Sequence, residues 1–202
     1  MERINLKFSD KFGSHWIKVK FYREKPALKE TQKSKGMRFC EAAKEAIKGP
    51  VLLDKDGISC LGAQYAFGWR PDYKNGLLNN CQDKRKVQLG ILKSMFLKMP
   101  NFKKPFKYIG LNTEGQPDLI MSYMSPEKIM NLIKIYNNRY GKNLDVSLCS
   151  MMSICGGIAV KTYLNKQVNV SFGCNDSRRL ADMQRNNLAI GIPNRLFKSF
   201  ID

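Results

Sequence analysis

Cysteines are the residues of this sequence best suited to metal or redox chemistry, because the chain has six of them and one histidine. No two cysteines form a Cys-x-x-Cys pair, so the common zinc-ribbon and thioredoxin signatures are absent. A bacterial ferredoxin run of closely spaced cysteines is absent too. A metal centre in this protein would therefore draw its ligands from separate segments of a folded chain. The six cysteines are Cys40, Cys60, Cys81, Cys149, Cys155 and Cys174.

Four of the cysteines form two similarly spaced pairs. Residues 41–59 separate Cys40 from Cys60, and residues 156–173 separate Cys155 from Cys174. The two spacings differ by one residue, as expected if the chain contains two related halves that each supply one pair. Pairs from two halves that pack together would bring the four thiols toward one point.

The local sequence around these cysteines suits thiolates. A glycine directly follows Cys155 and another directly precedes Cys174. Glycine allows the backbone to approach a ligated sulfur closely and to donate its N–H to it. Cys40 and Cys155 are expected at helix starts, where the helix dipole stabilises negative charge and lowers a thiol pKa. The arginines that could offset the charge of a thiolate centre are Arg38, Arg178 and Arg179.

Four soft thiolates with His15 as the only imidazole favour an iron–sulfur cluster or a Cys₄ zinc site. We predict one [4Fe–4S] cluster, with zinc as the alternative metal. The remaining cysteines, Cys81 and Cys149, are interpreted as small buried apolar residues. Structural disulfides are not expected in a reducing compartment. The predicted cofactor ligands are Cys40, Cys60, Cys155 and Cys174.

The elements that must position these thiols can be predicted from hydrophobic periodicity. Ser125 and Pro126 suit the start of a helix, as N-cap and first helical residue. Residues 145–152 are expected to form a strand or buried segment. Strands are expected over residues 16–22, 51–53, 108–111, 118–123, 168–172 and 188–193. Helices are expected over residues 38–48, 60–68, 87–99, 126–140, 155–163 and 195–201. The fold class is therefore α/β (mixed α+β).

The order of these elements repeats along the chain. A strand followed by Pro26 corresponds to a strand followed by Pro126, and each half continues with a cysteine at a helix start, a strand and a second cysteine. The sequence therefore predicts a single compact domain over residues 1–202 with two pseudo-symmetric halves, 15–112 and 117–202. Mixed sheets and flanking helices would surround a shared cysteine site.

The same landmarks resemble a known family over residues 15–198. The first half has Trp16-x-x-Val19-Lys20-Phe21, then Arg38-Phe39-Cys40, then Cys60-Leu61-Gly62-Ala63. The second half has Pro117-Asp118, Cys155, Asn169-x-Ser171-x-Gly173-Cys174 with Arg178, and Ile190-Gly191-Ile192-Pro193. This pattern is similar to the family called domain of unknown function 169, which is uncharacterised. The resemblance implies that the recurrent cysteines of the family match Cys40, Cys60, Cys155 and Cys174. The chain departs from the family in its strong basicity and in two extra cysteines, Cys81 and Cys149.

Charge and hydropathy set limits on partners and compartment. The formal net charge is +18, but the basic residues are mostly lysines spread along the chain, which is typical of a general surface charge. A nucleic-acid partner is less favoured, because clustered arginine and interleaved aromatic residues are missing. No apolar run approaches the roughly 18 residues of a membrane span, and residues 1–21 do not resemble a secretory signal. We therefore expect a cytoplasmic protein without a membrane partner.

Three functions follow from these observations, and the sequence does not decide whether the protein is an enzyme. The first is an iron–sulfur protein in electron transfer or a cluster-dependent redox reaction, with an unknown redox partner or a small anionic ligand. The second is a zinc-stabilised or metal-free basic binding module for an anionic partner. The third is a cysteine-thiol redox protein. The sequence contains no P-loop, Gly-x-Gly-x-x-Gly or Gly-x-Ser-x-Gly motif.

Overall fold

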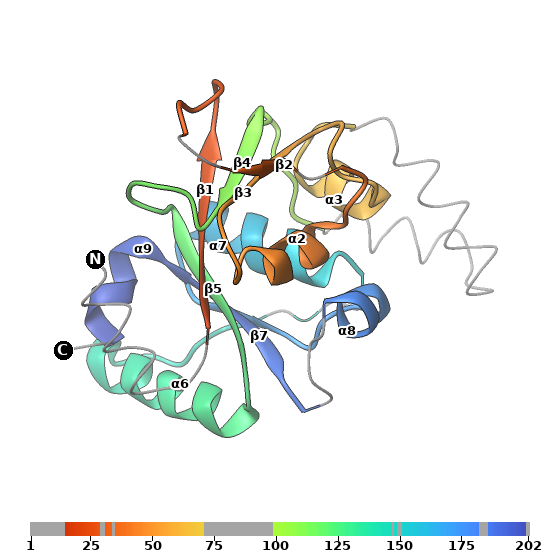
Figure 1. Ribbon diagram of the computed structural model, residues 1–202. Coiled ribbons are helices and arrows are strands. Elements are labelled where there is room, and N and C mark those ends of the chain that lie inside the picture. The colour runs from red at the N-terminus through yellow and green to blue at the C-terminus, as the bar shows by residue number, and fades with distance from the viewer. Residues whose placement is uncertain are drawn as a thin grey trace.

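A seven-stranded sheet forms the centre of the protein in the computed structural model, which describes residues 15–28, 31–33, 35–70, 99–146, 148, 151–181 and 186–200 (Figure 1). The strand order is β2-β3-β4-β1-β5-β7-β6, and only the β2–β3 pair is parallel. The mixed α+β class predicted from the sequence is confirmed. The strands are β1 (Trp16–Tyr22), β2 (Gln32–Lys33), β3 (Val51–Asp54), β4 (Tyr108–Leu111), β5 (Leu119–Met124), β6 (Asn169–Ser171) and β7 (Leu188–Pro193).

Strands β1 and β5 lie side by side at the middle of this sheet. They are antiparallel, with Trp16 opposite Ser122 and Val19 opposite Leu119. Outward from this pair, β4 and then β3 follow β1, while β7 and then β6 follow β5. The two predicted halves therefore share one strand arrangement. In the first half β4 lies between β1 and β3, and in the second half β7 lies between β5 and β6. Two halves related by a two-fold axis between β1 and β5 would give this order, although the pseudo-symmetry itself stays a prediction.

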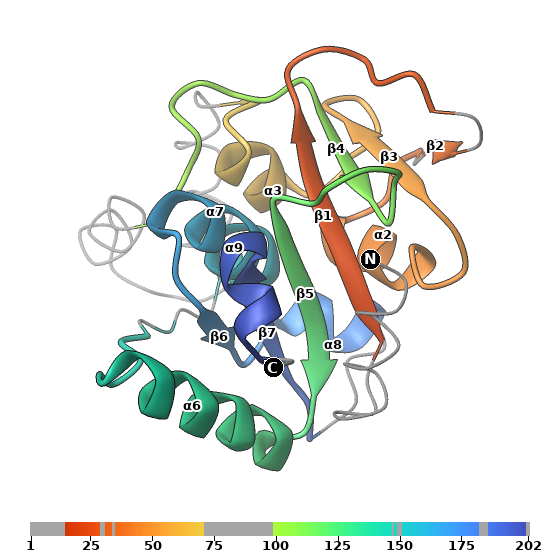
Figure 2. The ribbon, with the colours of Figure 1, turned by 90° about the vertical axis from the view of Figure 1, so that its left-hand side faces the viewer.

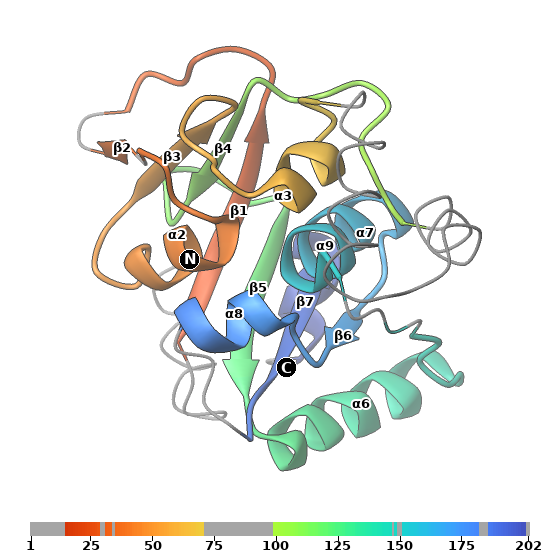
Figure 3. The same cartoon turned by 90° about the vertical axis from the view of Figure 1, so that its right-hand side faces the viewer.

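One face of the sheet carries all four of the predicted ligands. Alternation along β1 directs Ile17, Val19 and Phe21 to this face, where they join an apolar core that includes Cys40 and Cys155. Figure 3 views the molecule from the side on which the covering helices gather. These helices are α2 (Phe39–Glu45), α3 (Leu61–Ala66), η2 (Ser153–Val160), α7 (Lys161–Asn165) and α8 (Asn175–Leu180).

The opposite face is covered by α6 (Pro126–Tyr140), α9 (Asn194–Phe197) and the 3₁₀ turn η3 (Lys198–Phe200), and Figure 2 shows α6 and α9 from this side. Its core holds β-strand residues such as Ile120 and Ile190 against Leu132 and Phe197. Helix α6 has regular ends. The Ser125 hydroxyl accepts from the Lys128 N–H at 3.4 Å, and Gly141 ends the helix at φ 61°.

Most predicted elements are present with shifted ends. The predicted 38–48 helix stops at Glu45, and the 155–163 helix begins earlier, at Ser153, as a π-helix that runs into α7. Strand β2 was not predicted, because its two residues lie in a polar segment. The helix predicted over 87–99 lies outside the described residues up to position 98. The described residues of 145–152 form no strand, although Met151 and Met152 are buried.

No helix in the described part of the chain is both long enough and apolar enough to cross a membrane.

Candidate metal centre

Cys40 lies in the first turn of α2, directly after Phe39. Helix α2 begins at Arg38, whose N–H donates to the Glu41 carboxylate at 2.8 Å. The buried residues of the helix include Phe39, Cys40 and Ala43, so the thiol points into the core rather than to solvent. The backbone N–H of Glu41 acts to lower the pKa of the Cys40 thiol. The predicted position at a helix start is confirmed for this cysteine.

Cys60 is the N-cap of α3. The backbone N–H groups of Ala63 and Gly62 act to lower the pKa of its thiol, and they are among the N–H groups that a helix start leaves without intrahelical partners. Gly62 also provides space: a Cβ placed on it would lie 2.8 Å from Met152 Cγ and 3.8 Å from Cys60 Sγ. The Met152 side chain therefore packs against this glycine, beside Cys60.

Cys155 is buried in η2, a π-helix of eight residues. Met152 precedes this helix with φ 49° and ψ 30°, a left-handed conformation that is uncommon for a residue other than glycine. Its carbonyl accepts from the Gly156 N–H at 2.7 Å and the Gly157 N–H at 3.0 Å. The same Gly156 N–H acts to lower the pKa of the Cys155 thiol. Strained backbone and π-helical turns concentrate at functional sites, and both occur beside this cysteine.

Cys174 is the N-cap of α8 and is partly exposed. Its N–H donates to the Ser177 hydroxyl at 2.9 Å, and that hydroxyl donates back to the Cys174 carbonyl at 2.9 Å. Gly173, with φ 79°, turns the chain from β6 into this cap. Cys60 and Cys174 are thus equivalent in position, because each caps a short helix that follows a strand. The sequence predicted neither the cap nor the full extent of α8.

Electrostatic interactions connect the four thiols, and the pKa of Cys155 is raised by burial and then by the charges of the other three. The charges of Cys174 and Cys60 act on Cys40, and that of Cys174 acts on Cys60. The charges of all three act on Cys155. Such effects require short separation in a protein interior. The structure therefore brings the four sequence-predicted residues to one region, from four separate elements.

Burial controls the ionisation of these thiols. Desolvation is the largest cause that raises the pKa of Cys40 to about 12, and the charges of Cys174 and Cys60 add to it. Desolvation likewise raises the pKa of Cys60 and, further still, that of Cys155. Helix-start N–H groups and the Arg38 guanidinium act in the opposite direction at Cys60 but do not outweigh burial. Without a metal the thiols of Cys40, Cys60 and Cys155 are protonated at neutral pH, whereas a lowered thiol pKa at a helix start was predicted for Cys40 and Cys155.

The described residues contain no compact group of three or more His, Cys, Asp or Glu side chains placed to hold a metal ion. A single zinc ion would require such a group, because Zn–S bonds of about 2.3 Å put tetrahedral sulfurs roughly 4 Å apart. In a cluster each thiolate binds a different iron, so the sulfurs of the four ligands lie farther from one another. The donor set of four thiols with backbone N–H donors is chemically suited to such a cluster.

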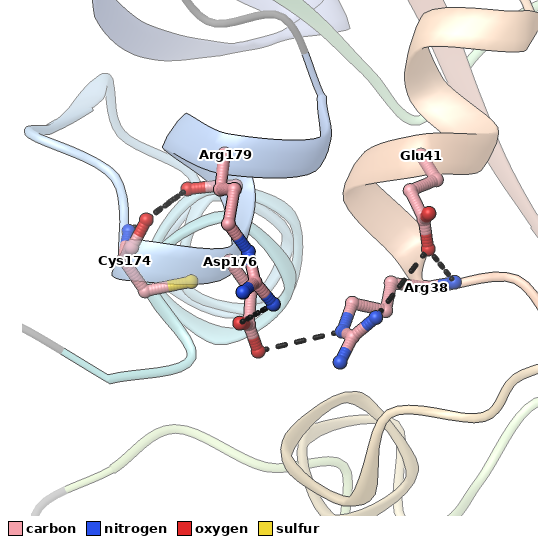
Figure 4. A network of polar contacts seen from close by, with 6 residues as sticks. Arg38, Glu41, Cys174, Asp176 and Arg179 are labelled. Carbon is pink, nitrogen blue, oxygen red and sulfur yellow. Dashed lines mark hydrogen bonds and ion pairs between the residues drawn. The ribbon is translucent and has the colours of Figure 1, made fainter.

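An ion-pair network joins the two halves at the rim of the cysteine region (Figure 4). Arg38, next to the start of α2, lies with its Nε 3.4 Å from the carboxylate of Asp176 in α8. Arg179 lies 3.8 Å from the other oxygen of the same carboxylate. Arg178, by contrast, donates to the Asn187 carbonyl at 3.3 Å. Of the three arginines proposed from the sequence, Arg38 is the one whose charge lowers the pKa of a cysteine, Cys60.

Tyr123 is a residue of this region that the sequence reasoning missed. It lies on β5 and packs against the core that contains Cys40 and Cys155. Its hydroxyl oxygen is buried and has no hydrogen-bond partner in the described part of the chain. Burial, followed by the charges of Cys40, Cys174 and Cys155, raises the pKa of this hydroxyl. The available signal was its place in the alternation of β5, where Leu119, Met121 and Tyr123 share one face.

The remaining candidates lie elsewhere. Cys81 and Cys149 fall outside the described residues, so their predicted role as buried apolar side chains stays a prediction. His15 is exposed, and its carbonyl accepts from the Ser122 hydroxyl at 2.8 Å.

Comparison with known proteins gives one match. The model of the DUF169 family, described as an uncharacterised ArCR family, matches residues 13–202. No curated protein and no solved structure matches the chain.

Proposed function

The chain belongs to the domain of unknown function 169 family, and from that premise we propose that it is an iron–sulfur protein. One [4Fe–4S] cluster would be held by Cys40, Cys60, Cys155 and Cys174. The observation that carries the proposal is the proximity of these four cysteines, whose charges act on Cys40, Cys60 and Cys155. They come from α2, α3, η2 and α8, which cover one face of a single sheet.

The surroundings of the thiols favour ligated thiolates. Backbone N–H groups of Glu41, Gly62, Ala63 and Gly156 act to lower the pKa of the neighbouring thiols. Such donors stabilise ligated thiolates and influence cluster potentials. Four soft thiol donors in a chain with one histidine favour an iron–sulfur cluster, with a Cys₄ zinc site as the alternative. A bound cluster supplies one-electron redox chemistry.

The exposure of the four cysteines indicates where this centre would exchange electrons with a partner. Cys40 and Cys155 are buried, whereas Cys60 and Cys174 are partly exposed. Electrons would therefore enter and leave on the side of Cys60 and Cys174, where Arg38 and Asp176 form the rim. A centre with two buried and two partly exposed ligands is suited to electron transfer or to a cluster-dependent reduction.

The thiol-redox alternative is less well supported by the same site. A dithiol enzyme needs a thiolate nucleophile at neutral pH, which requires a lowered thiol pKa. Burial instead raises the pKa of Cys40, Cys60 and Cys155. Metal coordination resolves this conflict, because a metal centre displaces the thiol protons when it binds.

Anaerobic purification followed by iron, zinc and acid-labile sulfide analysis tests the proposal. We expect a brown protein with about four irons and four sulfides per chain, the content of one [4Fe–4S] cluster, after reconstitution if not before. Zinc in about equimolar amount, without sulfide, would replace the cluster by the Cys₄ site. A colourless protein with neither metal, even after reconstitution, would refute both.

A further inference from the structure

Tyr123 stands at the centre of the sheet, on the face that carries the four cysteines. In the pairing of β5 with β7 it lies opposite Ala189, a small buried residue of the same core. The bulk of the tyrosine is therefore directed into the space between the sheet and the helices that carry the thiols. The residue as a whole is partly buried, and its hydroxyl oxygen is fully buried.

The hydroxyl has no hydrogen-bond partner among the described residues. A buried polar group without a partner costs free energy that phenylalanine at the same position would not incur. The groups whose charge acts on this hydroxyl are the thiols of Cys40, Cys174 and Cys155. The missing partner is therefore best sought in the group that those cysteines would hold, since the hydroxyl lies near three of the four proposed ligands.

We propose that the Tyr123 hydroxyl donates a hydrogen bond to a sulfur atom of the centre held by the four cysteines, as a positioning residue. This inference rests on the proposed function. Because the hydroxyl is neutral, it donates without adding charge. A donor to a cluster sulfur withdraws negative charge from it and favours the reduced form, which is the more negative one. Tyr123 would thus raise the reduction potential of the centre.

The first experiment compares reduction potentials. Reconstituted wild type, Tyr123→Phe and Tyr136→Phe are titrated anaerobically after their iron and sulfide contents have been matched. Tyr136 is the control, since it is also buried but belongs to the core of the opposite face. We expect Tyr123→Phe to keep its iron and to shift to a lower potential, while Tyr136→Phe keeps the wild-type value. An unchanged potential in the Tyr123 variant would overturn the inference while the iron–sulfur assignment stands.

The second experiment uses the metal-free protein, so that it does not depend on cluster assembly. Removal of a hydroxyl that lacks a partner should stabilise the apo fold, and Tyr123→Phe should melt at a higher temperature than wild type by circular dichroism. After reconstitution this advantage should shrink or reverse, because wild type has then gained a hydrogen bond. An apo variant that melts lower than wild type would mean that the hydroxyl already has a partner within the chain. Absence of iron from reconstituted wild type would instead refute the proposed function and, with it, this role.

Discussion

The two faces of the sheet are built from the same strands but differ in kind. On one face, α6 has a serine N-cap, a proline at its start and a glycine C-cap, and it packs Leu132 and Tyr136 on the sheet. On the other face, short helices begin at cysteines, a π-helix replaces the regular turn and Met152 adopts a left-handed conformation. The first face follows the ordinary rules of local structure, and the second departs from them.

This difference indicates where function lies. Departures from local rules reduce stability, so they persist where the surrounding structure and a function require them. In this protein the strained Met152, the unpartnered hydroxyl of Tyr123 and the raised thiol pKa values all occur around one group of sulfurs. Both faces pack an apolar core that stabilises the fold, and the cysteine face is also where chemistry is expected.

The largest expected effect separates the two faces directly. Cys155→Ala leaves a cluster with three of its four protein ligands, so most of the iron should be lost after anaerobic reconstitution. Leu132→Ala creates a cavity on the opposite face and should cost about 2–5 kcal/mol of unfolding free energy with the iron content of the folded protein unchanged. Iron analysis and chemical denaturation measure both. The proposal that the cysteine face binds iron would be contradicted if Cys155→Ala kept its full iron content and the alanine variants of Cys40, Cys60 and Cys174 did so too.

A smaller effect is expected from the glycine beside Met152. Gly62→Ala places a Cβ 2.8 Å from Met152 Cγ, so Met152 must move, at a cost of about 1–3 kcal/mol. Partial loss of iron should accompany the loss of stability, because the same helix start carries Cys60. The matched control is Gly49→Ala, where a Cβ meets nothing within 4 Å. If the two variants have the same melting temperature and iron content, the packing of Met152 against Gly62 contributes neither to stability nor to iron binding.

The pH dependence of the stability of the metal-free protein tests the burial of Cys40. Burial raises the pKa of Cys40 to about 12 from its ordinary value of 9.0, so the folded form favours the protonated thiol. This contribution to stability is fully present below about pH 9 and is lost as pH rises toward about 12. The apo protein should therefore melt at progressively lower temperature over that range, and Cys40→Ala should weaken the decline. Identical pH profiles for the two proteins would contradict the burial of this thiol.

The smallest expected effect concerns the rim. The Arg38 guanidinium lowers the pKa of Cys60, so Arg38→Gln should raise that pKa and slow the alkylation of Cys60 in the apo protein at a fixed pH near 9. Loss of the partly exposed pair with Asp176 should cost at most about 1 kcal/mol. Peptide mass spectrometry of iodoacetamide-treated protein gives the rate for Cys60. Lys48→Gln, a change of an exposed lysine after the same helix, is the control and should leave the rate unaltered.

Much of the fold could be predicted from periodicity and caps. The alternation in β1 and the Ser125–Pro126 start of α6 are strong local signals, and both elements are present. The two-residue strand β2 and the π-helical start of η2 were missed because their local sequences do not determine them. Strand β2 forms by pairing with β3, and η2 depends on the left-handed Met152.

Similar spacing and neighbouring glycines pointed to Cys40, Cys60, Cys155 and Cys174, and the structure places them on, or at the start of, helices that cover the same face of the sheet. Their role as ligands stays a prediction. The raised pKa values of Cys40, Cys60 and Cys155 were not foreseen, because helix starts lower a thiol pKa locally while burial depends on the packing of distant segments. Tyr123 was missed for the same reason. The sequence places this tyrosine in a strand but does not show which distant groups lie near its hydroxyl.

The most direct test of the central claim is the Mössbauer spectrum of wild-type protein reconstituted anaerobically with ⁵⁷Fe and sulfide. The four converging thiols predict that most of the iron gives the spectrum of one [4Fe–4S] cluster per chain, and that the quadruple Cys→Ala variant gives none of it. The account would be contradicted by a wild-type spectrum of adventitious mononuclear iron alone, identical to that of the quadruple variant.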